Sequence, residues 1–257
     1  MERLQLVKLG GKIISNEVML NASLSSFASI SGRKILVHGG GNAATELAKR
    51  MNVPVQMQEG RRITDDAMLH IVTMIYGGLL SKNVVAKLQA LGVNGIGLSG
   101  ADGNIILSDR RPVKTIDYGN VGDIKQVDSD KLAQMLSIDL VPIICALTHD
   151  GKGNILNTNA DTIAAAISEA MSINFEVELC YAFELNGVLS DLEDENSVIK
   201  KINTAEFERM KELGTINEGM IPKIFNALQA CRSGVHKVYI CNYNDFAEPQ
   251  KGTEICL

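Results

Sequence analysis

The sequence predicts an α/β protein with a mostly parallel central sheet that helices cover on both faces. Six short segments are almost continuously apolar, which is typical of strands buried on both faces. Helical patterns lie between most of these segments, so helices are expected to join successive parallel strands. The predicted strands are Leu4–Leu9, Lys34–His38, Gly95–Leu98, Val141–Leu147, Glu178–Leu185 and Lys237–Asn242.

The first strand carries a lysine inside its apolar run and ends in paired glycines. Lys8 precedes Gly10 and Gly11 in the stretch KLGGK. A lysine is rarely placed in a buried strand unless a partner balances its charge. The stretch matches neither the P-loop pattern nor the dinucleotide-binding pattern G-x-G-x-x-G. Phosphate binding here would need another scaffold, and the pattern of an NAD-dependent oxidoreductase is absent.

The second strand leads through a glycine turn into a helix. Gly39, Gly40 and Gly41 follow the strand in VHGGGN. Such a turn exposes backbone N–H groups to an anion, and the helix dipole adds partial positive charge there. Together with the first strand end, the turn predicts a shared phosphate site. The helix is predicted from the apolar spacing of Ala44, Leu47, Ala48 and Met51.

A third segment, LNTNADTIAAAISEAM, places three short polar residues at alternate positions before a helix. Any of Asn157, Asn159 and Asp161 is suited to cap the helix by accepting backbone N–H bonds. Capping needs one such residue, so the surplus favours a functional role for at least one. The helix is predicted from the apolar stripe Ile163, Ile167, Ala170 and Met171.

A fourth segment, Gly214–Leu228, is a glycine turn followed by a helix. Lys223 directly follows Pro222 in the first turn of this helix. A lysine is unfavourable beside the positive end of a helix dipole, and a bound anion would offset that penalty. Considered alone, the position is better explained by an exposed surface lysine.

Other segments predict how the chain is organised. Asn104–Asp128 combines short β-like pieces, turn residues and mixed charge, which is typical of hairpins at a sheet edge. A boundary near Ser172–Phe175 would divide the chain into lobes of residues 1–174 and 175–257 that share a continuous sheet. The helix Thr64–Ala90 is either a dimer surface or ordinary core packing. Its apolar residues include Ala67, Ile71, Met74 and Ile75.

Composition excludes several classes of partner. The net charge of −5 provides no excess of positive charge for binding nucleic acid or an acidic membrane surface. No run of 18 apolar residues occurs, so no membrane-spanning segment is expected. The N-terminus has no signal-like apolar core, because lysines interrupt it. Five cysteines without CxxC spacing suit reduced thiols in the cytoplasm. The four histidines show no metal-binding spacing; His38 is expected to be structural.

Taken together, these segments resemble the amino acid kinase family, and within it the members that phosphorylate N-acylated glutamate. The resemblance covers the chain from Leu4 almost to its C-terminus, with five motifs in the family's order. These motifs are KLGGK at Lys8–Lys12, HGGG at His38–Gly41, GRRIT at Gly60–Thr64, NTNAD at Asn157–Asp161 and EGMIPK at Glu218–Lys223.

The resemblance implies a fold and an activity. The fold is a three-layer αβα sandwich with a mainly parallel central sheet, in which the N-terminal lobe binds the acylated amino acid and the C-terminal lobe binds ATP. The activity is transfer of a phosphoryl group from ATP, with Mg²⁺, to the side-chain carboxylate of N-acetyl-L-glutamate, the second step of arginine biosynthesis. No protein ligand for the metal is assigned. The early start of the first strand further predicts a cytoplasmic homodimer without arginine feedback.

The resemblance also implies residue roles. Lys8 and Lys223 would stabilise the transferring phosphoryl group, and Asp161 would position both lysines. The substrate-binding residues would be Gly40, Gly41, Arg62 and Asn157, whereas Gly10, Gly11, Glu184, Asn186, Gly187 and Thr215 would contact phosphate or nucleotide.

The chain departs from the family at the nucleotide-binding strand. Family members usually carry a pattern like TDVDGV there, whereas this chain has FELNGVL at Phe183–Leu189. Gly187 is retained, but Glu184 and Asn186 replace shorter acids. An unusually shaped nucleotide pocket is therefore expected.

The chemistry of phosphoryl transfer to a carboxylate is consistent with these residue roles, independently of the resemblance. A glutamate side chain, with a pKa of about 4.3, is ionised at neutral pH and needs no general base to attack phosphorus. It needs relief of the repulsion between two anions, which lysines and backbone N–H groups supply. Arg62 suits a bidentate grip on a carboxylate. Its neighbour Arg61 is expected to face solvent.

Three alternatives stay open. Glutamate 5-kinase, carbamate kinase, aspartokinase and uridylate kinase share the scaffold, although the GRRIT and NTNAD pair favours an N-acylated substrate. Some bacteria use succinylated intermediates, so N-succinyl-L-glutamate is a second possible acceptor. A non-catalytic metabolite sensor on the same fold is the third, but binding alone does not require Lys8, Lys223 and Asp161 together.

Overall fold

The main feature of the computed structural model is an eight-stranded sheet. The structure describes residues 1–58, 60–191, 193–216 and 220–257. Neighbouring strands run parallel except for one antiparallel pair, β13 and β14. In spatial order the strands are β12 (Lys201–Ile202), β14 (Thr253–Ile255), β13 (Lys237–Asn242), β11 (Phe175–Phe183), β1 (Glu2–Leu9), β2 (Arg33–His38), β8 (Val141–Cys145) and β5 (Gly95–Leu98).

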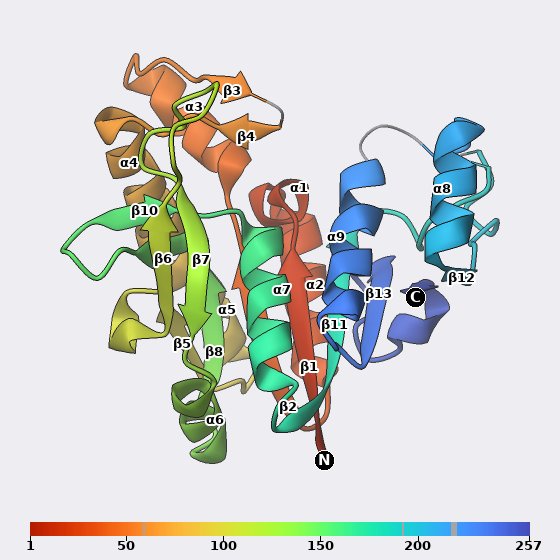
Figure 1. The fold of residues 1–257 in the computed structure, drawn as a ribbon. Helices are drawn as coiled ribbons and strands as arrows, with labels where there is room; N and C mark the ends of the chain where they lie inside the picture. Colours follow the sequence, from red (N-terminus) through yellow and green to blue (C-terminus); the bar gives the residue numbers. More distant parts are fainter. Residues whose placement is uncertain (59, 192, 217–219) are drawn as a thin grey trace.

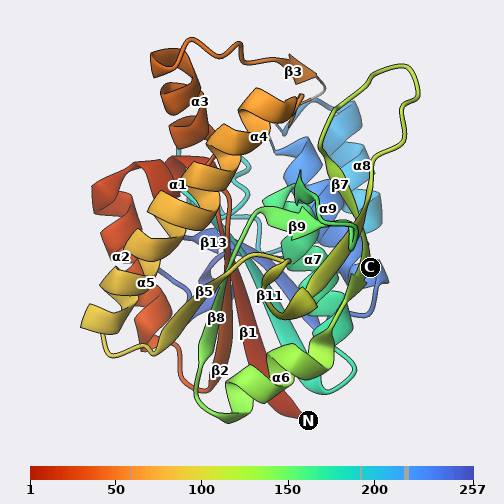
Figure 2. The ribbon, with the colours of Figure 1, turned by 90° about the vertical axis from the view of Figure 1, so that its left-hand side faces the viewer.

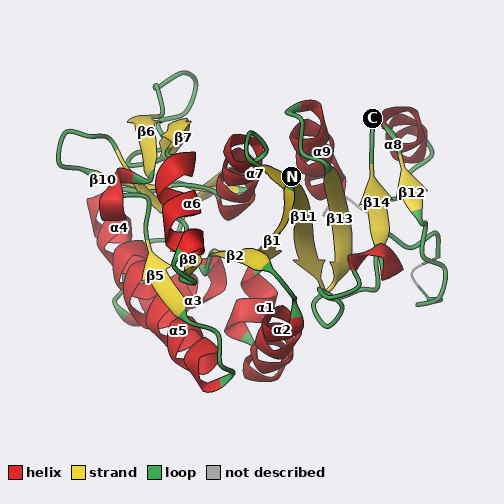
Figure 3. Cartoon of the chain, turned by 90° about the horizontal axis from the view of Figure 1, so that it is seen from below, coloured by secondary structure: helices red, strands yellow, loops and turns green. Residues whose placement is uncertain are grey.

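Helices cover both faces of this sheet, so the predicted three-layer αβα sandwich is confirmed (Figures 1 and 3). One layer contains α1 (Gly11–Ser15), α2 (Glu17–Ser29), α3 (Gly41–Arg50), α4 (Asp66–Val72) and α5 (Ser81–Ala90). The other contains α6 (Ser129–Ser137), α7 (Ala160–Met171) and α9 (Ile221–Arg232), with α8 (Thr204–Glu212) beside β12 at the far end.

All six predicted strands are present in this sheet, although some boundaries differ. The predicted strand Glu178–Leu185 runs from Phe175 to Phe183, and the first two strands begin one or two residues earlier than predicted. The predicted strand Val141–Leu147 ends at Cys145, and Leu147 begins a separate strand. The two strands that the sequence did not indicate, β12 and β14, are only two and three residues long. Such short edge strands carry too few residues for an alternating or continuous apolar pattern.

The segment Asn104–Asp128 does form a hairpin, but in a second sheet rather than at the edge of the main one. This sheet has the order β10-β9-β6-β7. Its strands are β6 (Ile106–Arg110), β7 (Gly122–Val127), β9 (Leu147–His149) and β10 (Ile155–Asn157).

The remaining short elements lie outside both sheets. β3 (Met57–Gln58) pairs with β4 (Arg61–Arg62) in a small hairpin. Two 3₁₀ turns are η2 (Asp102–Asn104) and η3 (Pro249–Lys251).

A continuous helix from Asp66 to Ala90 joins α4 and α5 through a π-helical segment, η1 (Thr73–Leu80) (Figure 2). Among the described residues, it is the one helix long and apolar enough to cross a membrane, although the sequence was expected to contain no such segment. Its inner face belongs to the protein core, where Ile71 and Ile75 are buried. The outer face leaves Met74 and Leu79 exposed. The predicted apolar face of this helix is therefore divided between core and surface.

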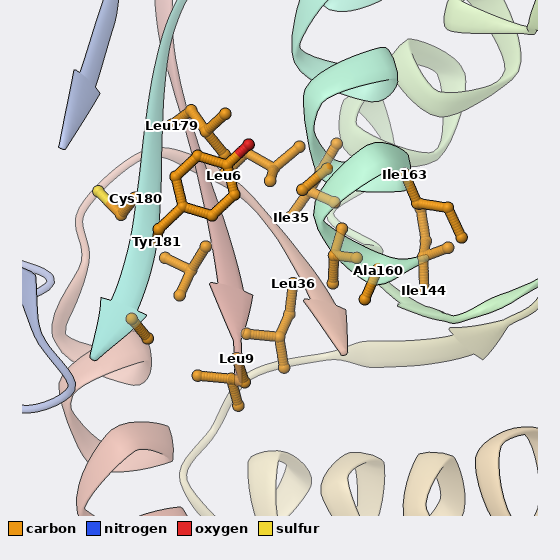
Figure 4. Close-up of a cluster of buried hydrophobic side chains, with 14 of the residues drawn as sticks. Leu6, Leu9, Ile35, Leu36, Ile144, Ala160, Ile163, Leu179, Cys180 and Tyr181 are labelled. Carbon is orange, nitrogen blue, oxygen red and sulfur yellow. The ribbon is translucent and has the colours of Figure 1, made fainter. Parts of the chain in front are cut away.

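The core between β1, β2, β11 and α7 holds the ends of these elements in fixed positions (Figure 4). Leu6, Ile35, Ile163 and Leu179 are fully buried there. Each such side chain contributes roughly 1.5–3 kcal/mol relative to leaving it in water. Residues that follow these strands, or begin α7, are thereby placed on a rigid base.

The central sheet runs without interruption through both predicted lobes. β11 begins at Phe175, where the second lobe was predicted to start, and pairs with β1 from Glu2↔Phe175 to Lys8↔Tyr181. The division into residues 1–174 and 175–257 stays a prediction about which part binds which substrate.

Gly187 follows β11 at a point where another strand comes very close. A Cβ added there would lie 2.7 Å from Thr253 Oγ1 and 2.9 Å from Val198 Cγ1. Thr253 has little freedom to move, because its hydroxyl accepts a 2.8 Å hydrogen bond from the Val188 N–H. Gly187→Ala should therefore lower the free energy of unfolding by about 1–3 kcal/mol in urea denaturation.

The matched control is Gly78→Ala. Gly78 is helical and exposed, and an added Cβ would meet no atom within 4 Å. This substitution should raise stability by about 0.5–1 kcal/mol, since alanine loses less conformational freedom in a helix. Equal stabilities for the two variants would contradict the close-packing role of Gly187.

Candidate active site

The candidate site lies at the carboxyl ends of β1, β2 and β11. β1 is central, β2 lies on one side of it, and β11 lies on the other. A crevice outside the carboxyl ends of parallel strands is the usual binding position in open α/β sheets. Lys8, the glycine turn after β2 and Glu184 after β11 all come from these three strand ends.

Lys8 in β1 is paired with Asp161 in the first turn of α7. The Nζ–Oδ1 distance is 2.7 Å, and the side chains are only 14% and 22% exposed. This carboxylate is the partner that allows a lysine within a largely buried strand. Asn159 caps α7 by accepting from the backbone N–H groups of Asp161 and Thr162, so Asp161 is free to hold the lysine.

Lys223 lies in the first turn of α9, as predicted, and is half-buried. Its Nζ is 3.6 Å from the centroid of the Phe183 ring, and it forms no ion pair within the described part of the chain. Its pKa is lowered to about 8, mainly because burial disfavours the charged form and next because Lys8 is positive; Glu184 and Asp161 act in the opposite direction. The lysine is therefore a cation placed where a bound anion would stabilise it.

A cavity of about 340 Å³ opens beside Lys8. No acidic side chain is among its described lining residues, whereas four cationic side chains are. The lining includes the cations Lys8, Arg61, Arg62 and Arg111 with Gly11, Gly39, Gly40, Gly41, Tyr76, Val121, Ala146, Asn157 and Thr158. Its charge and size suit a small molecule with more than one carboxylate.

Arg62 in β4 is fixed against the glycine turn. Its Nη2 donates to Gly41 O at 2.9 Å and to Thr45 Oγ1 at 2.7 Å. Asn157, which also lines the cavity, donates from Nδ2 to Thr64 Oγ1 at 2.9 Å. Both predicted substrate-binding side chains therefore line one cavity in fixed orientations, while their contacts to a substrate stay predictions.

Gly40 is required by the protein itself. It has φ = +158° at the N-cap of α3, and a Cβ there would overlap Leu80 and lie 2.9 Å from Tyr76 Cδ1. Gly41 is different, because the nearest atom to an added Cβ is Arg62 Nη2 at 3.7 Å. Its lack of a side chain leaves room on the cavity side.

Two arginines of the cavity were not assigned from the sequence. Arg61 is exposed, as expected, yet it lines the cavity as well as facing solvent. Arg111 follows β6, and its guanidinium donates to Asp123 through Nε at 3.0 Å and lies over the Tyr118 ring. No pattern around Arg111 in the sequence indicates this position, since only the folding of the β6–β7 hairpin brings it to the cavity.

The predicted nucleotide-binding residues follow β1, β11 and α8 in the chain. Gly10 and Gly11 begin α1, and Glu184 Oε1 lies 3.8 Å from Lys12 Nζ. Asn186 Nδ2 donates to Glu195 O at 3.2 Å.

Thr215 lies after α8, and its hydroxyl donates to Met210 O at 3.1 Å. Glu218 and Gly219 of the EGMIPK motif lie outside the described residues. The contacts of all these residues with nucleotide stay predictions.

His38 is fully buried at the end of β2. Its Nδ1 lies 2.9 Å from Gly39 O, and burial lowers its pKa to about 4, so the ring is neutral at physiological pH. This environment fits the structural role expected for His38. In the part of the chain that the structure describes, no group of three or more His, Cys, Asp and Glu side chains could hold a metal ion.

Comparison with known proteins places these features in a family. A model of the amino acid kinase family matches residues 3–242. The acetylglutamate kinase of Bacteroides fragilis is 52% identical over 239 residues, which cover 93% of this chain and 92% of that protein. The acetylglutamate kinase of Parabacteroides distasonis is 50% identical over 255 residues, covering 99% of this chain and 100% of that one.

The fold is also similar to that of a solved structure. The Streptococcus mutans protein smu.665 is 26% identical and superposes with a TM-score of 0.77, covering 98% of each chain. The similarity therefore extends over both sides of the site.

The lowered pKa of Lys223 has a consequence for stability. The native lysine titrates near 8, whereas its ordinary value is 10.5. Between these values the unfolded chain binds more protons, so this group makes the free energy of unfolding rise with pH. The rise should be smaller in Lys223→Met, measured by urea unfolding across the interval.

The control is Lys152→Met, which removes an exposed lysine from a turn. This variant should keep the wild-type dependence on pH. A profile for Lys223→Met that is parallel to the wild type would show that burial does not perturb Lys223.

Proposed function

The chain belongs to the amino acid kinase family, and we propose that it transfers the γ-phosphoryl group of ATP to the side-chain carboxylate of N-acetyl-L-glutamate. The product is N-acetylglutamyl 5-phosphate, formed in the second step of arginine biosynthesis. Relatives named acetylglutamate kinase are 50–52% identical over almost the whole chain. The observation that carries the proposal is the pair Lys8–Asp161 with Lys223 nearby, next to a cavity whose described lining residues include no acidic side chain.

The reaction needs charge compensation rather than proton transfer. An ionised carboxylate oxygen attacks the γ-phosphorus, the bond to the bridging oxygen breaks, and ADP leaves with the electron pair. Lys8 and Lys223 offset the negative charge shared by the attacking, transferring and leaving groups. Asp161 holds Lys8 at 2.7 Å and so fixes its direction before the substrates bind.

We further propose that Mg²⁺ enters with ATP. It prefers phosphate and water oxygens with few protein ligands. The described residues fit this, because they present lysines at the phosphate side and no cluster of acidic side chains. Bound there, Mg²⁺ would neutralise phosphate charge.

A second acceptor has a specific observation in its favour. N-acetylglutamate has two carboxylates. Arg61 and Arg62 line the cavity together with Lys8 and Arg111, which are already paired with Asp161 and Asp123. N-succinyl-L-glutamate carries a third carboxylate, which the exposed guanidinium of Arg61 at the cavity would attract. It is therefore the second candidate substrate.

We also propose a cytoplasmic homodimer. The outer face of the helix Asp66–Ala90 exposes Met74 and Leu79, and Met57 is exposed on the neighbouring hairpin. Exposed apolar side chains on one long helix are suited to pack against the same helix of a second copy.

The function is tested by ATP-dependent formation of an acyl phosphate, trapped with hydroxylamine. N-acetylglutamate should be phosphorylated in preference to free glutamate, aspartate and carbamate, with N-succinylglutamate assayed in parallel. A higher kcat/KM for the succinyl compound would make it the natural acceptor. Selective turnover of a non-acylated acceptor would assign the chain to another kinase of the family. ATP binding without any turnover would favour a sensor.

Arg62→Lys should weaken acceptor binding more than ATP binding. Lysine cannot reproduce a bidentate contact to a carboxylate. The KM for the acylglutamate should rise roughly ten- to hundredfold, as for the loss of one charged hydrogen bond. The control Arg50→Lys changes an exposed arginine at the end of α3 and should leave both KM values unchanged. Equal changes in the two KM values would remove Arg62 from the acceptor site.

A further inference from the structure

Lys12 is a third lysine at the phosphate side of the site. It is the second residue of α1 and directly follows the paired glycines at the end of β1. Its Nζ lies 3.8 Å from Oε1 of Glu184, which follows β11. β1 and β11 are adjacent parallel strands, so the two side chains come from neighbouring strand ends.

The contact between Lys12 and Glu184 is loose. A distance of 3.8 Å exceeds that of a hydrogen bond, and the Lys12 side chain is 77% exposed. Exposed ion pairs of this kind contribute little to stability. The pair therefore holds Lys12 near the site without fixing it there, unlike the short and shielded pair of Lys8 with Asp161.

Lys12 and Glu184 also belong electrostatically to the candidate active site. The charge on Lys223 is disfavoured by Lys8 and Lys12 and favoured by Glu184 and Asp161. Three lysines thus share one small region with two carboxylates. This leaves an excess of positive charge before any phosphate binds.

We propose that Lys12 binds the phosphates of the nucleotide, and that Glu184 is the partner it leaves when the nucleotide arrives. This inference rests on the proposed function, since it assumes that the anion is ATP. The phosphates of ATP carry more negative charge than one carboxylate and attract the lysine more strongly. Lys12 is mobile enough to exchange one partner for the other, because its contact with Glu184 is long and exposed.

The exchange gives the two residues opposite effects on affinity. Lys12 adds attraction for the nucleotide, whereas Glu184 both competes for the lysine and repels the phosphates. A purely structural ion pair would behave differently, because removing either partner would have the same effect. The sign of the change in ATP affinity therefore separates the two roles.

The test compares Lys12→Met, Glu184→Gln and the double variant by steady-state kinetics and by calorimetric titration with Mg-ATP. Lys12→Met should raise the KM for ATP roughly tenfold, as expected for the loss of one charged hydrogen bond, with the acceptor KM unchanged. Glu184→Gln should lower the KM for ATP roughly two- to fivefold by releasing the lysine. In the Lys12→Met background, Glu184→Gln should lower the KM for ATP less than it does in the wild type, because no lysine is left to release and only the repulsion of the phosphates is removed.

A second ion pair supplies the control. Lys201 Nζ lies 3.7 Å from Glu254 Oε1, with side chains 63% and 35% exposed, on β12 and β14, the outer two strands at one edge of the sheet. Lys201→Met and Glu254→Gln should leave the KM for ATP unchanged. Circular dichroism of every variant checks that folding is retained.

Two results would overturn the inference. One is an ATP affinity of Lys12→Met equal to that of the Lys201→Met control. The other is a loss of ATP affinity in Glu184→Gln, which would make Glu184 itself a nucleotide-binding group. Failure of the proposed function would give a different result from failure of this inference, because the wild type would then phosphorylate none of the acceptors. The calorimetric affinities of the variants for Mg-ATP would still decide whether Lys12 binds the nucleotide.

Discussion

The structure of the site depends on an unequal balance of charge at the carboxyl edge of the central sheet. Lys8 is tolerated in a largely buried position because Asp161 lies 2.7 Å away, whereas Lys223 lies over an aromatic ring and has no carboxylate of the described residues at comparable distance. Holding this charge in place costs free energy in the unliganded protein, as the lowered pKa of Lys223 indicates. A phosphate bound beside Lys223 would remove that cost.

The glycines near the site are explained by two different requirements, close packing of the fold and free space for a ligand. Gly40 and Gly187 are required because side chains or backbone of other elements occupy the space that a Cβ would need. Gly11 and Gly41 meet no such obstacle, so their lack of a side chain leaves space free beside the cavity. A glycine-rich motif therefore combines residues that pack the fold with residues that make room for a ligand.

The sequence predicts those parts of the fold that depend on local pattern. The six predicted strands of the main sheet, β1, β2, β5, β8, β11 and β13, are largely apolar, and Asn159 and Lys223 occupy the helix-start positions expected of them. The remainder depends on contacts between distant segments. Arg111 reaches the cavity only because the β6–β7 hairpin belongs to a second sheet, and the strands β12 and β14 are too short to leave a pattern. Likewise, nothing next to Gly187 in sequence indicates Thr253.

The two lysines to which the family resemblance gives one role occupy different positions in the candidate site. Lys8 lines the cavity, whose described lining has no acidic side chain, and also pairs with Asp161, so it borders both the proposed acceptor side and the proposed phosphate side. Lys223 is not among the described residues that line the cavity; it lies beside Phe183, in reach of the charges of Glu184 and Asp161. Among the described residues, Asp161 lies against Lys8 and Glu184 acts on the charge of Lys223, whereas no carboxylate lines the cavity itself. In the proposed reaction, Lys8 would therefore act on the attacking oxygen and the transferring group, and Lys223 on the nucleotide side of the same bond.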